Sequence, residues 1–138
     1  TPEFKRLIGY VTSFASGCLY CQAHTILGAE RFGCTKKRLK EVWNYANSSA
    51  FSNAEKSALD FAFAAASVPN KVTEKEASQL KIYWSDNDIV EIMGVIALFG
   101  FLNRWNDSMG SALEDLPIEK GEEHLMENTN WTPGKHRV

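Results

Sequence analysis

The residues best able to do chemistry lie together in the segment from Ser16 to Thr25, which reads SGCLYCQAHT. Cys18 and Cys21 are three residues apart, so on a helix their Cα atoms lie about 5–6 Å from each other, within the range that a disulfide needs. A helix start after Gly17 would also direct free backbone N–H groups at Cys18 and favour its thiolate form. The spacing therefore predicts a thiol pair that opens and closes as a redox-active disulfide.

A histidine follows the thiol pair by about one helical turn. At 100° per residue, His24 lies roughly 60° from Cys21 and roughly 120° from Cys18 around the helix axis. Because the ordinary pKa of imidazole is about 6.5, His24 can take a proton from a neighbouring thiol near neutral pH. The attacking thiol stays open at this point, since the helix start favours Cys18 and the histidine favours Cys21.

A zinc site is the alternative interpretation of the same residues, because Cys18, Cys21 and His24 supply three possible ligands. A fourth could come from His124, His136 or Cys34. However, three ligands on one helix form a poor tetrahedral cage, and the chain has no second CxxC motif. We therefore expect no bound metal and no other cofactor. Covalent haem attachment is excluded, because it needs a histidine directly after the second cysteine.

Two carboxylates are candidates for a proton relay with the histidine. Glu91 is the only charged residue between Ile89 and Leu102, and an ionised carboxylate among apolar residues is costly unless it is paired or used. Glu55 is the second candidate, although the spacing from Ser52 to Glu55 also predicts a capping box at a helix start.

Composition limits the function classes that remain. A chain of 138 residues with 44% apolar residues predicts one globular domain over residues 1–138. A near-balance of 15 basic and 17 acidic residues does not favour a nucleic-acid partner. Three cysteines do not make a secreted disulfide framework, so we expect a reducing, cytoplasmic setting. Because the chain begins with Thr1 rather than Met, we expect that its N-terminus is incomplete.

Helix-start signals recur along the chain and predict an all-α fold of about six helices. We expect helices over 2–15, 18–32 and 35–47, two more that begin at the Ser52 and Thr73 capping boxes, and a long one from Ser85. The apolar stretch from Ile89 to Leu102 is too short for a membrane span and predicts a buried helix. Residues 118–138 contain scattered proline and glycine, so we expect an irregular tail there.

The run from Gly17 to Thr25 resembles the thiol motif of the alkylhydroperoxidase D-like branch of the carboxymuconolactone decarboxylase family. Segments 51–59, 88–92 and 103–107 are similar to that family's later landmarks, in the same order, so the resemblance covers about residues 6–117. It implies an all-helical protein that assembles as a homotrimer or homohexamer. It also implies peroxide reduction through the cysteine pair, with a glutamate and a histidine relaying protons.

The sequence departs from that branch at two positions. Twelve residues before the first cysteine the branch usually has glutamate, where this chain has Arg6, and four residues after the second it has histidine, where this chain has Thr25. His24 lies one residue earlier and can stand in. We therefore expect a thiol-dependent peroxidase or disulfide reductase for antioxidant defence, with a small peroxide as substrate and an external thiol as reductant. The alternative is a non-catalytic or zinc-binding helical oligomeric module.

Overall fold

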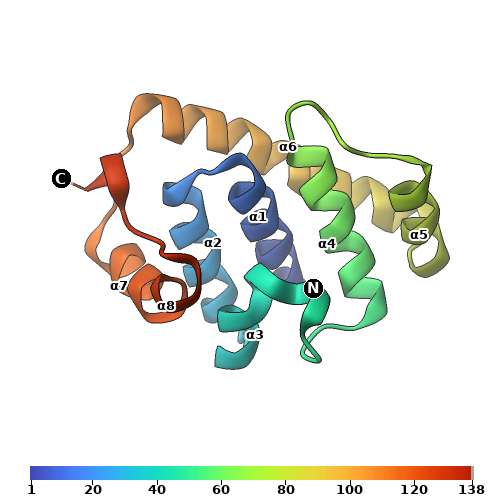
Figure 1. Cartoon of the computed structure of the whole chain (residues 1–138), viewed down its shortest axis with the longest axis horizontal. Coiled ribbons are helices and arrows are strands. Elements are labelled where there is room, and N and C mark those ends of the chain that lie inside the picture. The colour runs from blue at the N-terminus through green and yellow to red at the C-terminus, as the bar shows by residue number, and fades with distance from the viewer. Residues whose placement is uncertain (138) are drawn as a thin grey trace.

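The computed structural model describes residues 1–137, which form eight α-helices, two short 3-10 helices and no strands (Figure 1). This confirms the all-α prediction. The α-helices are α1 (Pro2–Ser16), α2 (Leu19–Arg31), α3 (Lys36–Glu41), α4 (Asn53–Ala66), α5 (Glu74–Tyr83), α6 (Asp86–Met109), α7 (Asp115–His124) and α8 (Met126–Thr129). The 3-10 helices are η1 (Val42–Asn47) and η2 (Gly134–His136).

Helix α1 is the centre of the core and packs against α2, α4 and α6. It begins as its sequence predicts, with Pro2 in the first turn and the hydroxyl of Thr1 accepting the backbone N–H of Phe4. It ends at Gly17, whose φ of 78° is left-handed, and the chain then turns back into α2. This tight turn places Cys18 at the start of α2, beside the last turn of α1.

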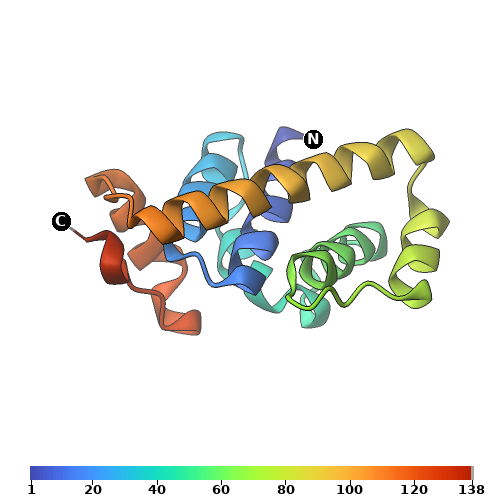
Figure 2. The same cartoon turned by 90° about the horizontal axis from the view of Figure 1, so that it is seen from above.

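Helix α6 runs lengthwise across the molecule, as Figure 2 shows, with α5 near its beginning and the C-terminal segment near its end. It approaches α1 closely, because a Cβ atom on Gly9 would lie 2.6 Å from the ring of Phe99. The prediction of a buried helix is correct for one face only. Ile92, Ile96 and Phe99 are buried, whereas an apolar strip on the other face is exposed in the single chain. No helix in the described part of the chain is both long enough and apolar enough to cross a membrane.

The prediction of an irregular tail over 118–138 is wrong for its first part, and the helix count of six is correspondingly too low. Residues 115–129 form α7 and α8, and α7 packs against α2. Pro117 lies in the first turn of α7, where a missing N–H costs nothing. Gly121 is needed for packing, since a Cβ atom there would lie 2.6 Å from the indole of Trp131. These two residues resembled helix breakers only because their partners are distant in sequence.

Candidate active site

Both cysteines of the CxxC motif are buried thiols at the start of α2. Cys18 is the N-cap residue, and its sulfur accepts a hydrogen bond from the backbone N–H of Cys21 at 3.4 Å. This is the helix-start geometry that the sequence predicts for Cys18. The two side chains therefore share one end of the helix, as a redox pair requires.

The electrostatic environment distinguishes the two thiols. A hydrogen bond from the Cys18 thiol lowers the pKa of Cys21 to about 7, against the opposing effect of burial. The side-chain amides of Asn103 and Asn106 contribute, and Asn106 Nδ2 lies 3.8 Å from the sulfur of Cys21. The same hydrogen bond and burial raise the pKa of Cys18 far above its ordinary value, and the Cys21 N–H offsets only part of this. Near neutral pH, Cys21 is thus the more acidic thiol and Cys18 its proton-bearing partner.

Cys21 lines a pocket of about 470 Å³ between α1, α2 and α6. One wall is apolar and comes from α6, through Val95, Leu98, Phe99 and Leu102. The remaining lining is polar or aromatic and comprises Lys5, Arg6, Tyr20, Cys21, His24 and Asn106. A small organic molecule in this pocket would contact the more acidic thiol directly.

His24 lines the same pocket, and its polar contact is with a carboxylate rather than with a sulfur atom. Its Nε2 lies 3.0 Å from Glu114 Oε2, although the two groups are not aligned as a hydrogen bond. The imidazole stacks on Tyr20 at 4.5 Å between ring centroids, and the Tyr20 hydroxyl donates to Glu114 at 3.5 Å. Burial lowers the pKa of His24, and the charge of Glu114 opposes this shift. A neutral imidazole able to accept a proton therefore faces the pocket at neutral pH.

The two carboxylates that the sequence suggests for the relay do not reach His24. Glu91 is exposed on α6, and its nearest cation is Lys5 at 3.8 Å. Glu55 forms the predicted capping box with Ser52 and pairs with Arg38 at 2.6 Å. The carboxylate beside His24 is instead Glu114, which precedes α7. Sequence reasoning missed it because it lies 90 residues from His24 along the chain, and only tertiary packing brings the two together.

Cys34 and Thr25 lie outside this arrangement. Cys34 is buried near Glu3 and Arg38, and burial raises its pKa to about 12. Thr25 is fully buried, and its hydroxyl donates to the backbone carbonyl of Cys21 at 2.8 Å within the helix. Neither residue is placed to exchange protons with a molecule in the pocket.

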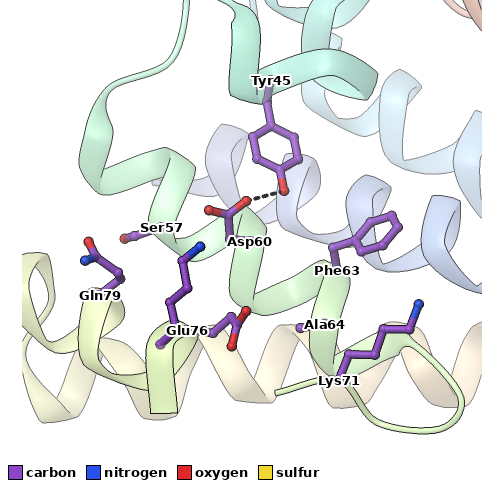
Figure 3. A pocket seen from close by; sticks show the side chains of 9 residues that line it. Tyr45, Ser57, Asp60, Phe63, Ala64, Lys71, Glu76 and Gln79 are labelled. Atoms are coloured by element: carbon purple, nitrogen blue, oxygen red, sulfur yellow. Dashed lines mark hydrogen bonds between the residues drawn. The ribbon is translucent and has the colours of Figure 1, made fainter. Parts of the chain in front are cut away.

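A second cavity, of about 300 Å³, lies between α4 and α5 (Figure 3). The Tyr45 hydroxyl donates to Asp60 there at 2.7 Å. Its lining contains no cysteine or histidine. This cavity therefore lacks the groups needed for thiol chemistry.

In the described part of the chain, two groups of three side chains offer closely spaced donor atoms for a metal. The first comprises Glu30, Glu123 and His124, where Lys120 already pairs with both carboxylates, at 2.9 and 3.1 Å. The second comprises Cys18, Asp107 and His136. The zinc alternative built on Cys18, Cys21 and His24 is not one of these groups.

Residues 1–64 match the model of the carboxymuconolactone decarboxylase family. This chain belongs to that family. The matched region contains α1, α2 and the whole CxxC motif, so this carboxymuconolactone decarboxylase family protein carries its thiols within the shared segment. No curated protein sequence matches the chain.

Solved structures extend the comparison to most of the chain. The debrominase Bmp8 is 33% identical with a TM-score of 0.86, over 89% of this chain and 66% of the debrominase chain. A cysteine-to-alanine variant of the same debrominase, in complex with 2,3,4-tribromopyrrole, is 32% identical with the same coverage and TM-score. This family member thus spans slightly less than two thirds of the debrominase.

A more distant structure shares the fold. It is a protein of unknown function from Agrobacterium tumefaciens that has been suggested to be the antioxidant defence protein AhpD. It is 20% identical with a TM-score of 0.67, over 76% of this chain and 73% of its own. The similarity confirms an AhpD-like fold for this family member.

Proposed function

We propose that this protein is a dithiol-dependent reductase of small organic electrophiles, with organic hydroperoxides as its first substrate class. One observation carries the proposal: the more acidic thiol, Cys21, opens onto a largely apolar pocket, and the protonated thiol of Cys18 lies directly behind it. An attacking and a resolving thiol are the two groups that a two-electron reduction needs.

In the proposed reaction, the Cys21 thiolate attacks the terminal oxygen of the hydroperoxide. An S–O bond forms, the O–O bond breaks, and the leaving alkoxide takes a proton and departs as the alcohol. Cys18 then attacks the sulfur of the Cys21 sulfenic acid, so that an S–S bond forms and water leaves. Overall, one hydroperoxide and two thiols give one alcohol, one water and one disulfide, and an external thiol reduces the disulfide again.

His24 supplies the proton transfer in this proposal. As a neutral imidazole it accepts the proton that Cys21 loses, and as an imidazolium it returns a proton to the leaving alkoxide. Glu114, 3.0 Å away, stabilises the imidazolium between these steps. Arg6, which replaces the usual glutamate of the thiol branch, also lies in the pocket lining, where its guanidinium packs over the ring of Phe32.

Reductive debromination is a second candidate, favoured by the 33% identity to a debrominase over 89% of this chain. In that reaction the Cys21 thiolate would take the bromine of a bromopyrrole while the ring carbon gains a proton. Cys18 would then attack the brominated sulfur, forming the disulfide and releasing bromide. The same two thiols supply both electrons, so the pocket lining decides between the substrates.

A substrate panel tests both candidates. The reduced protein is mixed with cumene hydroperoxide, hydrogen peroxide or 2,3,4-tribromopyrrole, with dithiothreitol as the external thiol, and alcohol or bromide release is measured. We expect turnover of cumene hydroperoxide that is lost in Cys21→Ser. Without dithiothreitol, Cys18→Ser should release one alcohol per chain and retain a Cys21 sulfenic acid that a sulfenic-acid reagent traps, because the resolving thiol is absent. Cys34→Ser is the matched control and should retain full activity. Bromide release without alcohol formation would assign the second candidate, and turnover that survives in Cys21→Ser would refute both.

The proposal includes a homo-oligomer, as the family resemblance implies. The exposed apolar strip of α6 comprises Val90, Met93, Leu98, Phe101, Trp105 and Met109. Single apolar residues on a surface are ordinary, but a continuous strip along one helix favours contact with another chain. The cytoplasmic setting stays a prediction from cysteine usage.

A further inference from the structure

The C-terminal segment brings a second histidine, His136, close to the sulfur of Cys18. His136 is 1% exposed, and its Nδ1 lies 2.8 Å from the backbone carbonyl oxygen of Ser111. Because a carbonyl oxygen only accepts hydrogen bonds, Nδ1 donates to Ser111 and Nε2 is the ring atom left for another partner. The ring also packs on Tyr20, and the His136 backbone carbonyl accepts the N–H of Leu113 at 2.8 Å. The imidazole is therefore held in one orientation.

The Nε2 atom of His136 points at two other potential ligands. It is buried without a hydrogen-bond partner and lies 3.5 Å from Oδ1 of Asp107. The ligand atoms of Cys18, Asp107 and His136 all lie within 4.8 Å of one another. A buried ring nitrogen without a partner beside a carboxylate is costly unless a positive charge, such as a bound metal ion, lies between them. The orphaned nitrogen therefore points to a cation as the missing partner.

We infer that reduced Cys18, Asp107 and His136 form a binding site for a divalent cation of the zinc type. A thiolate, a carboxylate and an imidazole are ordinary zinc ligands, and three protein ligands leave a fourth position for water. The thiolate disfavours magnesium and calcium, which prefer oxygen ligands. The Ser111 carbonyl is the outer partner that fixes the imidazole of a metal-binding histidine. On binding, Cys18 releases its proton to solvent, and no electrons are transferred.

Among the described residues, Lys135 is the side-chain cation that competes with a metal for Asp107, and its ion pair is weak. Lys135 Nζ lies 3.3 Å from Asp107 Oδ1, but both side chains are more than one third exposed, at 57% and 39%. Ion pairs of this kind contribute little and rearrange easily. The exposed part of Asp107 also gives a metal a path from solvent to the buried sulfur.

Cation binding and disulfide formation use the same sulfur atom and exclude each other. A disulfide between Cys18 and Cys21 removes the thiolate ligand, so oxidation should release the metal, and a bound metal should protect Cys18 from oxidation. The inference needs only reduced Cys18 and does not depend on which substrate the thiols reduce.

The test is a Zn²⁺ titration of the reduced full chain in competition with a chromophoric chelator, without peroxide. We expect one zinc per chain. Loss of an outer partner typically weakens zinc binding by about 10–100-fold, so His136→Gln and Asp107→Asn should weaken it at least as much. Glu123→Gln, from the other donor group, is the matched control and should bind as the wild type does. With Co²⁺, a thiolate charge-transfer absorption should appear in the wild type and be absent in Cys18→Ser.

Three results would overturn the inference. Unchanged affinity in both His136→Gln and Asp107→Asn would show that the CxxC thiols alone chelate zinc. Equal binding by the disulfide form would exclude Cys18 as a ligand, and failure of the reduced chain to bind would exclude the site. If His136→Gln does not fold, Asp107→Asn decides, because its side chain is 39% exposed. Peroxide turnover is measured separately with excess chelator, so the test of the proposed function does not depend on the outcome of the zinc titration.

Discussion

Trp131 donates its indole N–H to the backbone carbonyl oxygen of Leu19, 3.1 Å away, and so ties the C-terminal segment to the first turn of α2. The indole is 2% exposed and packs against Gly121 of α7. The C-terminal segment thereby lies against the start of α2, beside Cys18. This contact explains how Glu114 and His136, both far from the motif in sequence, reach the same end of α2.

The first prediction concerns the stability that this contact provides. Trp131→Ala should lower the free energy of unfolding by about 3–5 kcal/mol, because it removes a buried indole and leaves a cavity. Met126→Ala is the matched control in the same segment, since Met126 is about half exposed, and it should change stability by less than about 0.5 kcal/mol. Urea denaturation of both variants measures the difference, and equal midpoints would contradict the packing role.

The second prediction is a reversible intramolecular disulfide between Cys18 and Cys21. Their positions one helical turn apart allow a hydrogen bond between the two thiols, whereas Cys34 is buried elsewhere, beside Glu3 and Arg38. Mass spectrometry of the oxidised, alkylated protein should find the first two linked and Cys34 modified only after unfolding. A bridge to Cys34 as the main product would contradict the assignment of the redox pair.

The features that depend on local sequence could be predicted, and those that depend on distant contacts could not. The Ser52–Glu55 capping box and the Cys18 helix start follow from spacings of three residues, and both are present. Glu114, Asp107 and His136 meet the motif only through tertiary packing, which no spacing along the chain reveals. For the same reason, Glu91 was a plausible relay carboxylate from its apolar neighbours, yet it points to solvent beside Lys5.

The third prediction is a pH profile for alkylation. Because its pKa is lowered to about 7, Cys21 is protonated below that pH and a thiolate above it. Its rate of reaction with iodoacetamide should therefore rise with pH, with a midpoint near 7, and fall as the pH drops below 7. Cys18→Ala removes the thiol that donates to Cys21 and should move this midpoint upward. A midpoint that is unchanged in Cys18→Ala would contradict the hydrogen bond as the cause.

The fourth prediction concerns assembly through the exposed strip of α6. Phe101 and Trp105 stack on each other at 6.2 Å between ring centroids, although both are more than half exposed. Light scattering should give a trimer or hexamer for the wild type and a smaller species for Trp105→Glu. Ile82→Glu, which alters an exposed apolar residue on α5, should leave the assembly unchanged. A wild-type mass near 15.5 kDa at micromolar concentration would refute the oligomer.

The fifth prediction concerns the proton relay. His24→Ala should leave the fold intact and lower peroxide reduction at pH 7 by roughly 10²–10⁴, the range for loss of a positioned base. Glu114→Gln should cost a smaller part of the same rate, because it removes the charge that stabilises the imidazolium without removing the imidazole. The double variant should be no slower than His24→Ala, since groups that act as a unit are not additive.

Glu91 and Glu55, the two relay carboxylates that the sequence suggests, serve as controls for the His24 and Glu114 variants, because the contacts of each in the structure have a non-catalytic explanation. Glu91→Gln should not change the rate, since its carboxylate is exposed and only loosely paired with Lys5. Glu55→Gln should lower stability by about 0.5–2 kcal/mol through its cap and its contact with Arg38, while the rate per folded molecule stays the same. If Glu114 is the relay carboxylate, Glu114→Gln is the one variant of these three glutamates that should lower the rate, and its effect should not add to that of His24→Ala. A rate loss in Glu91→Gln that is non-additive with His24→Ala would instead require a rearranged pocket in which α6 supplies the acid.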